Sequence, residues 1–152
     1  CIVTGLELIE FGNIPTAFKA TFTCDSPYAY MSPRIYDYTV GGLMEIKLQN
    51  ESSINGYYKP VVEFYLDRGP TFSITNDSDN SRMMNFSNIP STVNKIVVDN
   101  ENGIITSNDP NVNLYPHFNM NFFRLVKGVN NLKIYGRGFV RFICEYPVNV
   151  GG

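Results

Sequence analysis

The sequence predicts an all-β fold, a two-sheet antiparallel β-sandwich with little or no helix. Apolar and polar residues alternate with a period of two, turn-forming residues separate the alternating runs, and no long window has a persuasive helical period. The alternating runs lie at residues 18–24, 44–49, 62–67, 72–74, 84–86, 96–98, 132–134 and 140–146. Each run is half polar and rich in β-branched or aromatic residues, as expected for strands that place one face on a core.

The breaks between the runs contain residues that favour turns. The Asn-Gly pair at 102–103, between two short apolar runs, is the clearest hairpin signal. Other turns are predicted where Gly, Pro, Asn or Asp cluster, at residues 55–56, 67–70, 88–90, 109–110, 127–128 and 130–131. The Gly-Arg-Gly segment at 136–138 is expected to form a tight turn or a bulge, because it is too short to cradle a phosphate.

The start of the chain is less regular than the rest. Residues 6–11 are compatible with a strand, and residues 12–15 interrupt it. We expect residues 1–19 to be the end of a preceding domain or a linker, and residues 20–152 to form the sandwich domain. The first residue is Cys1 rather than methionine, which suggests a fragment of a longer polypeptide, and no secretory leader is recognisable.

Length and composition exclude several classes of protein. The 152 residues fit one domain, and a hydrophobic content of 43% allows a real core and excludes wholesale disorder. The formal net charge is −2, so the chain lacks the basic field that nucleic-acid binding or attraction to anionic lipid requires. We therefore expect no nucleic-acid partner. Apolar runs span only a few residues, so we also expect no membrane insertion.

The three cysteines, Cys1, Cys24 and Cys144, form no CxxC pair. With a single histidine in the chain, no Cys/His metal cluster can be assembled. We expect these thiols to pack as small apolar groups in a reducing compartment.

No catalytic, cofactor-binding or metal-ligating residue is predicted. His117 is the only histidine and has no nucleophile motif beside it. Residues 77–81 begin like a calcium loop but lack the mid-loop glycine, and Asn88 stands where the terminal acid should be, so a solvated turn is the better interpretation. No pair of carboxylates stands out for hydrolysis, although a hydrolase with dispersed carboxylates is left open. We therefore expect neither enzyme activity nor a cofactor.

Four segments together resemble phage tail proteins. Residues 95–106 resemble their hairpin of strand, aspartate, polar turn and strand, and residues 122–134 resemble their F-x-x-L-x-x-G-x-N-x-I element. Residues 138–147 are similar to their last strand. Residues 22–30 resemble the junction between the N-terminal and C-terminal domains of distal tail proteins (Dit) of long-tailed phages. The resemblance extends over about residues 18–152.

This resemblance implies a galectin-like, jelly-roll type sandwich at the C-terminal end of a distal tail or baseplate protein. Such a protein is a structural component of a phage or prophage tail and acts by protein–protein assembly at the tail tip. Distal tail proteins form a hexameric ring, and their C-terminal domain faces outward. The implied partners are the tail tube, a tip protein and a receptor-binding protein, and the full-length protein is expected to be a homo-hexamer. Its expected location is the virion tail, after assembly in the bacterial host cytoplasm.

The alternative is a carbohydrate-binding module or adhesin domain for host attachment, with a cell-surface glycan as partner. Residues 117–119 (His-Phe-Asn) match the start of the galectin sugar-binding strand, but Met120 and Asn121 follow in place of Pro-Arg, and the chain contains no tryptophan to stack on a sugar. The densest aromatic group comprises Tyr28, Tyr30, Tyr36 and Tyr38. We interpret these tyrosines first as packing residues and second as contact residues.

Overall fold

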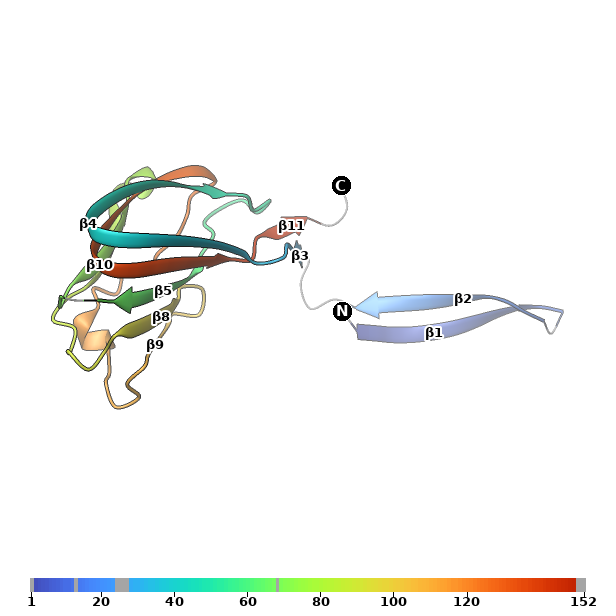
Figure 1. Ribbon diagram of the computed structural model, residues 1–152. Helices are drawn as coiled ribbons and strands as arrows, with labels where there is room; N and C mark the ends of the chain where they lie inside the picture. Colours follow the sequence, from blue (N-terminus) through green and yellow to red (C-terminus); the bar gives the residue numbers. More distant parts are fainter. Residues whose placement is uncertain (1, 13, 24–27, 68, 150–152) are drawn as a thin grey trace. The chain divides into compact units, whose positions relative to one another are not determined.

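Strands form almost all of the regular structure (Figure 1). The computed structural model describes residues 2–12, 14–23, 28–67 and 69–149. The chain divides into two compact units, one made of Cys1–Ala29 with Asn149–Gly152 and the other of Tyr30–Val148. The elements are β1 (Ile2–Phe11), β2 (Ile14–Thr23), β3 (Tyr28–Tyr30), β4 (Arg34–Asn50), β5 (Val61–Leu66), β6 (Phe72–Asn76), η1 (Asp77–Asp79), β7 (Arg82–Phe86), β8 (Lys95–Asp99), β9 (Ile104–Ser107), η2 (Tyr115–His117), β10 (Gly128–Cys144) and β11 (Pro147–Asn149). In the described residues, helical structure is limited to the 3-10 turns η1 and η2, and no helix has the length and apolarity needed to cross a membrane.

In the first unit, β1 and β2 pair as an antiparallel hairpin. The strand expected at residues 6–11 is confirmed, but residues 14 and 15 belong to β2 and not to the break that was predicted at 12–15. Register shifts between Val3 and Gly5 and between Ile9 and Glu10 accommodate one extra residue each. Apart from Ala20, which is half-buried, every residue of both strands is exposed, so the core expected beside the run at 18–24 is not supplied by the described residues.

In the second unit, β10 is the central strand of a curled sandwich. It pairs with β4 along its whole length, and on its other edge it pairs first with β6, at residues 132–135, and then with β5, at residues 138–143. Strands β6 and β7 therefore form one layer, and β5, β8 and β9 form the other. The predicted antiparallel sandwich with little helix is confirmed, and its two layers are parts of one hydrogen-bonded sheet.

Glycines allow β4 and β10 to curve together between the layers (Figure 1). Gly136 and Gly138 have φ angles of 148° and 138°, values that side-chain-bearing residues rarely adopt. A Cβ on Gly136 would lie 2.5 Å from the Cδ2 of Phe72, and one on Gly138 would lie 2.0 Å from the backbone oxygen of Tyr65. The tight turn or bulge expected at 136–138 is wrong, because the pairing with β4 continues without a register shift. Glycine here permits a continuous strand to bend.

The two layers enclose one apolar core. The rings of Phe64 on β5 and Phe72 on β6 lie 4.3 Å apart between centroids, and Phe86 on β7 lies 6.1 Å from Phe64. Residues 130, 132, 134, 136, 140, 142 and 144 of β10 are all buried, so the strand keeps one face on the core on both sides of the bend. The hairpin expected at the Asn-Gly pair 102–103 is confirmed, because β8 and β9 pair antiparallel across it.

Buried asparagines hold the irregular segment that precedes β10. The Asn130 Oδ1 accepts hydrogen bonds from the backbone N–H of Val126 and from the Nδ2 of Asn76, both at 2.9 Å. The Asn130 Nδ2 donates to the backbone oxygens of Val126 and Gly128. Asn130 is fully buried. The turn predicted at 130–131 is therefore wrong, because both residues lie within β10 and Asn130 serves as an internal clamp.

Asn100, after β8, makes a similar contact with the same segment before β10. The Asn100 Oδ1 accepts a hydrogen bond from the backbone N–H of Phe123 at 2.7 Å, and its Nδ2 donates to the backbone oxygen of Pro60 at 2.6 Å. Side-chain amides thus satisfy backbone groups that no β-ladder reaches. The segment resembling the F-x-x-L-x-x-G-x-N element is held in place by these bonds.

Candidate interaction surfaces of the sandwich

The His-Phe-Asn segment has structural contacts and does not form a galectin sugar-binding strand. His117 ends η2, and its Nδ1 lies 3.3 Å from the backbone oxygen of Ser87. Phe118 is buried and stacks on Phe86 at 4.7 Å between centroids. The Asn119 side-chain amide donates to a backbone oxygen of β7 at 2.8 Å. The three side chains thus contact neighbouring segments of the sandwich.

The acidic segment at 77–81 forms η1, and its carboxylates are paired with cations. The Asp77 carboxylate lies 2.7 Å from the Lys133 ammonium, whose hydrogen bond lowers the pKa of Asp77. Asp79 is buried and forms two hydrogen bonds with the Arg124 guanidinium, at 2.6 and 3.1 Å. The expected turn is present as η1, but the expectation that it is solvated is wrong at Asp79, which is buried. Within the described ranges, no group of three or more His, Cys, Asp and Glu side chains could hold a metal ion.

The tyrosines near the start of the second unit differ in role. Tyr36 and Tyr38 are half-buried and pack against the core, and the ring of Tyr38 meets that of Phe142 edge-on at 6.2 Å. The packing interpretation is confirmed for these two residues. Tyr28 and Tyr30 are 37% and 59% exposed.

Cys144 is a buried free thiol at the end of β10. Burial raises the pKa of its thiol to about 11, so the thiolate is scarce at neutral pH and the group behaves as a small apolar side chain. The expected packing of a cysteine as a small apolar group is confirmed at Cys144, whereas Cys1 and Cys24 lie outside the described residues.

Most charges on the outer face of the β4–β10–β5–β8 sheet are paired. The Arg141 guanidinium donates to both carboxylate oxygens of Asp37, at 2.8 and 2.9 Å, and this hydrogen bonding lowers the pKa of Asp37. The Lys95 ammonium lies 3.2 Å from the Glu63 carboxylate and 4.9 Å from the ring centroid of Tyr65. These groups satisfy one another and stabilise the sheet surface.

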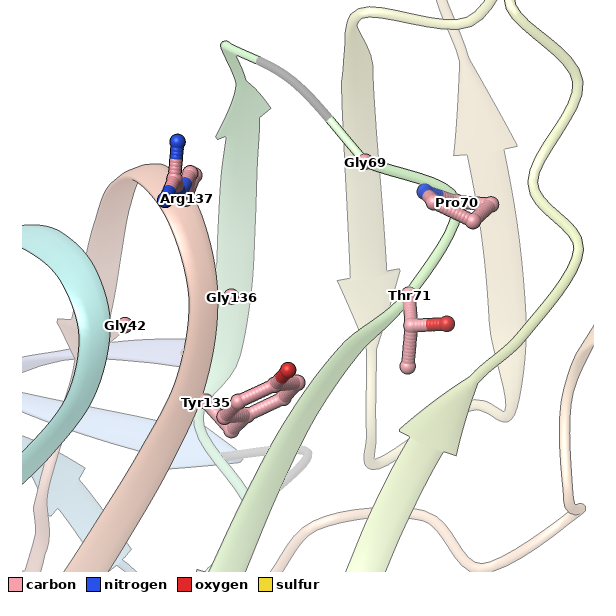
Figure 2. A pocket seen from close by; sticks show the side chains of 7 residues that line it. All are labelled: Gly42, Gly69, Pro70, Thr71, Tyr135, Gly136 and Arg137. Atoms are coloured by element: carbon pink, nitrogen blue, oxygen red, sulfur yellow. The ribbon is translucent and has the colours of Figure 1, made fainter.

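Arg137 is an exposed cation at the bend of β10, and it makes neither a hydrogen bond nor an ion pair through its side chain with any residue that the structure describes. It lines a pocket of about 310 Å³ together with Tyr135 and Thr71. Figure 2 shows this pocket between the bend of β10 and the segment at 69–71. An unpaired guanidinium beside an exposed phenol ring is suited to contact with a polar partner.

A second hollow, of about 640 Å³, adjoins the same arginine. It is lined by Thr39, Val40, Gly41, Tyr65, Leu66, Asp67, Arg137, Gly138 and Phe139. The rings of Tyr65 and Phe139 meet at 66° with centroids 5.7 Å apart. Aromatic faces next to a carboxylate, a guanidinium and a hydroxyl can bind a ligand that has both apolar and hydroxyl surfaces. Sequence reasoning missed this hollow because three separate strands supply its lining.

Comparison with known families identifies the sandwich. Residues 28–144 match the sequence model of the family described as phage tail C-terminal domain. The chain belongs to this family. The matched range contains both layers of the sandwich, the bend and the asparagine clamp, and the recognition of a phage tail domain is confirmed. The protein is therefore a structural component of a phage tail.

Among solved structures, the fold is similar to that of the SPP1 Dit protein, described as a paradigm of hub adsorption apparatus in Gram-positive infecting phages. The TM-score is 0.55 and the sequence identity is 12%, and the match covers 85% of this chain. At this identity the likeness shows a shared fold. The chain spans about half of that protein, 53% of its length. Comparison with curated proteins gives no match.

Proposed function

We propose that the chain is the outward-facing C-terminal sandwich of a distal tail or baseplate protein and acts by protein–protein assembly at the tail tip. The observation that carries this proposal is the match of residues 28–144 to the phage tail C-terminal domain family. The likeness of the fold to the SPP1 Dit protein supports the position at the hub. On this proposal the partners are the tail tube, a tip protein and a receptor-binding protein.

The physical properties of the sandwich agree with a scaffold. The bend, the asparagine clamp and the buried Asp79–Arg124 pair hold its segments rigidly. His117 and the acidic residues of η1 are engaged in structural contacts. These contacts support the proposed role as a scaffold without catalysis.

We further propose that residues 20–152 form the tail-component domain and that residues 1–19 belong to a preceding domain or linker. The family match begins at residue 28, after β2 has ended at Thr23, which supports a preceding domain or linker whose end lies later than residue 19. The full-length protein is proposed to be a homo-hexamer of the virion tail that assembles in the bacterial host cytoplasm. The SPP1 Dit protein is described as a hub, and closed rings of identical subunits are a common way to build symmetric assemblies.

The proposal is tested on phage particles and on the purified full-length protein. Mass spectrometry of purified virions is expected to detect peptides of this chain, and sedimentation velocity of the full-length protein is expected to give a hexamer. Electron microscopy with an antibody against the sandwich is expected to label the end of the tail tube. Absence of the chain from washed virions, or labelling along the tube and not at its end, contradicts the distal position.

A second candidate, recognition of a host-surface glycan, is favoured by one observation. The hollow beside Tyr65 and Phe139 combines an aromatic pair with the free Arg137 side chain. Aromatic rings stack on the C–H face of a pyranose, and a guanidinium donates to neighbouring hydroxyls. On a glycan array, Phe139→Ala and Arg137→Ala are expected to abolish saturable binding, whereas Lys127→Ala leaves it unchanged. Equal signals for all three variants, or no saturable binding at all, remove this candidate.

A further inference from the structure

Strand β4 carries a long outer edge that has no strand partner in the part of the sandwich that the structure describes. It pairs with β10 on one side over all of its 17 residues, and no described strand pairs with it on the other side. At about 3.3 Å per residue, this edge is about 56 Å long. An open edge presents backbone N–H and C=O groups with which another strand can pair.

The odd-numbered residues of β4 direct their backbone groups to this edge. Arg137 of β10 lies opposite one of them, and its backbone oxygen accepts a hydrogen bond from the N–H of Asp67, away from β4. Opposite residues of an antiparallel pair either bond to each other or both point away, and the two kinds of pair alternate. Among the described residues, the Tyr146 hydroxyl reaches this edge and donates to the Gln49 backbone oxygen at 2.7 Å. The outward backbone groups of residues 35–47 are therefore open to another strand.

The two ends of the sheet, β7 and β9, are covered instead. The segment at 117–119 forms backbone hydrogen bonds of 2.9 and 3.0 Å with β7 and the residue after it. Along β9, the Tyr115 hydroxyl accepts a hydrogen bond from the N–H of Ile105 and donates to the backbone oxygen of Gly103. Native proteins commonly cover their sheet edges, which prevents unwanted pairing. The longest edge of this sandwich is the one left open.

The core is also incompletely covered along β4. The half-buried side chains on the inner face of this strand are Tyr36, Tyr38, Met44 and Ile46. The residues opposite them on β10 are Phe142, Val140, Ile134 and Leu132, which are 0–1% exposed. A further strand beside β4 would remove this apolar rim from water, and the gain in free energy rises with the apolar area buried. The open edge therefore offers apolar contacts as well as hydrogen bonds.

The bend of β4 restricts which strand can pair along the whole edge. Gly42 is the middle residue of β4 and has a φ angle of 142°. In the pairing with β10 it lies opposite Gly136, so the bends of the two strands coincide. A strand that follows β4 through both layers needs a bend at the same point. The β4 strand of a second copy meets this requirement when it runs antiparallel and the two Gly42 residues face each other.

This register also matches the side chains of the two copies. On the outer face, it places Asp37 of one copy opposite Lys47 of the other, and Lys47 has no salt bridge with any described residue. On the inner face, it places Tyr38 opposite Ile46 of the other copy, so that half-buried side chains cover each other. No two like charges lie directly opposite, an arrangement that would be destabilising. The edge is therefore complementary to itself.

We propose that two copies of this chain associate through the outer edges of β4, antiparallel about a two-fold axis at Gly42, so that one curled sheet runs through both sandwiches. Neighbours within one six-fold ring are not related by a two-fold axis. In the proposed hexamer, this contact therefore joins chains of two separate rings. The inference rests on the edge of β4 and not on the position of the protein at the tail tip.

An engineered disulfide in the full-length protein tests the register. The proposed pairing places Thr39 of one copy opposite Glu45 of the other, with Cα atoms about 5.5 Å apart, a separation that disulfides favour. Within one copy the two positions lie about 20 Å apart along β4 and cannot be bridged. Under mild oxidation, Thr39→Cys/Glu45→Cys is expected to give disulfide-linked pairs of chains on a non-reducing gel. Mass spectrometry is expected to find the link between positions 39 and 45.

The single variants are the matched controls for this disulfide. In the proposed register, position 39 lies about 20 Å along the edge from position 39 of the other copy, and the same holds for position 45. Thr39→Cys alone and Glu45→Cys alone are therefore expected to give no more linked chains than the wild type, which supplies the background from the native cysteines. Absence of linked chains from the double variant, or equal yields from a single variant, overturns the proposal.

A charge at the centre of the edge gives an independent readout. Leu43 is 67% exposed and adjoins Gly42, so Leu43→Lys would bring two ammonium groups close together across the axis. In the Thr39→Cys/Glu45→Cys protein, this change is expected to lower the yield of linked chains at least about fivefold. Ile104→Lys, on the covered edge of β9, is expected to change the yield less than about twofold.

Equal losses of yield for the two lysine variants, or no loss with Leu43→Lys, contradict pairing through β4. None of these results depends on detection of the chain in virions, so this proposal and the proposed function fail separately.

Discussion

Gly136 of β10 lies directly opposite Gly42 of β4, next to the point where β10 exchanges its neighbour β6 for β5. Both glycines have large positive φ angles, 148° and 142°. Two facing glycines let paired strands bend together without loss of the ladder between them. The division of one sheet into two layers is therefore set at this pair, and the exposed Arg137 is placed at the same bend.

Substitution of a bend glycine is expected to destabilise the sandwich strongly. Gly138→Ala would bring its Cβ within 2.0 Å of the Tyr65 backbone oxygen at a φ of 138°, so we expect a loss of about 3 kcal/mol or more of unfolding free energy. Urea denaturation measures the loss. Gly41→Ala is the control, because its Cβ has no neighbour within 4 Å, and a change within about 0.5 kcal/mol is expected. Similar losses for both variants would disprove the role of the bend.

The asparagine clamp predicts a large difference between adjacent residues. Asn130→Ala removes the acceptor shared by the backbone N–H of Val126 and the Nδ2 of Asn76, so we expect a loss of about 2–4 kcal/mol in thermal or urea unfolding. Asn131→Ala removes only an exposed side chain and is expected to cost less than about 0.5 kcal/mol. If the two variants unfold at the same denaturant concentration, the clamp does not stabilise the fold.

The two acidic residues of η1 are expected to differ in energetic importance. Asp79→Ala leaves the Arg124 guanidinium without its bidentate partner, and we expect a loss of about 2–3 kcal/mol. Asp77→Ala breaks an exposed ion pair with Lys133, which is expected to contribute less than about 1 kcal/mol. Denaturation in low and high salt separates them further, because only the exposed pair is screened. A larger loss for Asp77→Ala would contradict this assignment.

The Asp37–Arg141 pair predicts a pH dependence. The hydrogen bond from Arg141 lowers the pKa of Asp37 below its ordinary value of 3.8. A carboxyl with a lowered folded pKa adds stability above its unfolded pKa and loses that stability as the pH falls through the folded value. Asp37→Asn is therefore expected to lower the unfolding free energy at pH 7, and the difference from the wild type is expected to shrink as the pH falls below 3.8. Asp67→Asn, which removes an exposed carboxylate outside this pair, is the control. A difference that is constant with pH would refute the coupling.

The strands and several turns were predictable because their signals are local. Alternation at 62–67 and 96–98 reports strands with one buried face, and the Asn-Gly pair at 102–103 favours the backbone of a tight hairpin. The resemblance to phage tail proteins depended on the spacing of such local segments, and the family match confirms it. The interpretation failed at 130–131 and 136–138, where residues typical of turns lie inside a long strand.

These failures have a common cause in long-range contacts. Asn130 can lie inside a strand because Asn76, Val126 and Gly128 form hydrogen bonds with its buried side chain. At Gly136, the ring of Phe72 occupies the space that a side chain would need. The hollow near Arg137 has the same origin, since residues 39, 65, 67, 137 and 139 become neighbours only when three strands pair. No local pattern contains that information.

By itself, the sequence determined that this chain is built of strands, which face of most strands is apolar, and to which class of tail domain it is related. The tertiary structure alone decided that one sheet bends into two layers, which asparagines are buried clamps, and which charges are left free on the surface. The physical reason is that side-chain periodicity is a property of neighbouring residues, whereas burial, charge pairing and the space beside a glycine depend on residues that folding brings together.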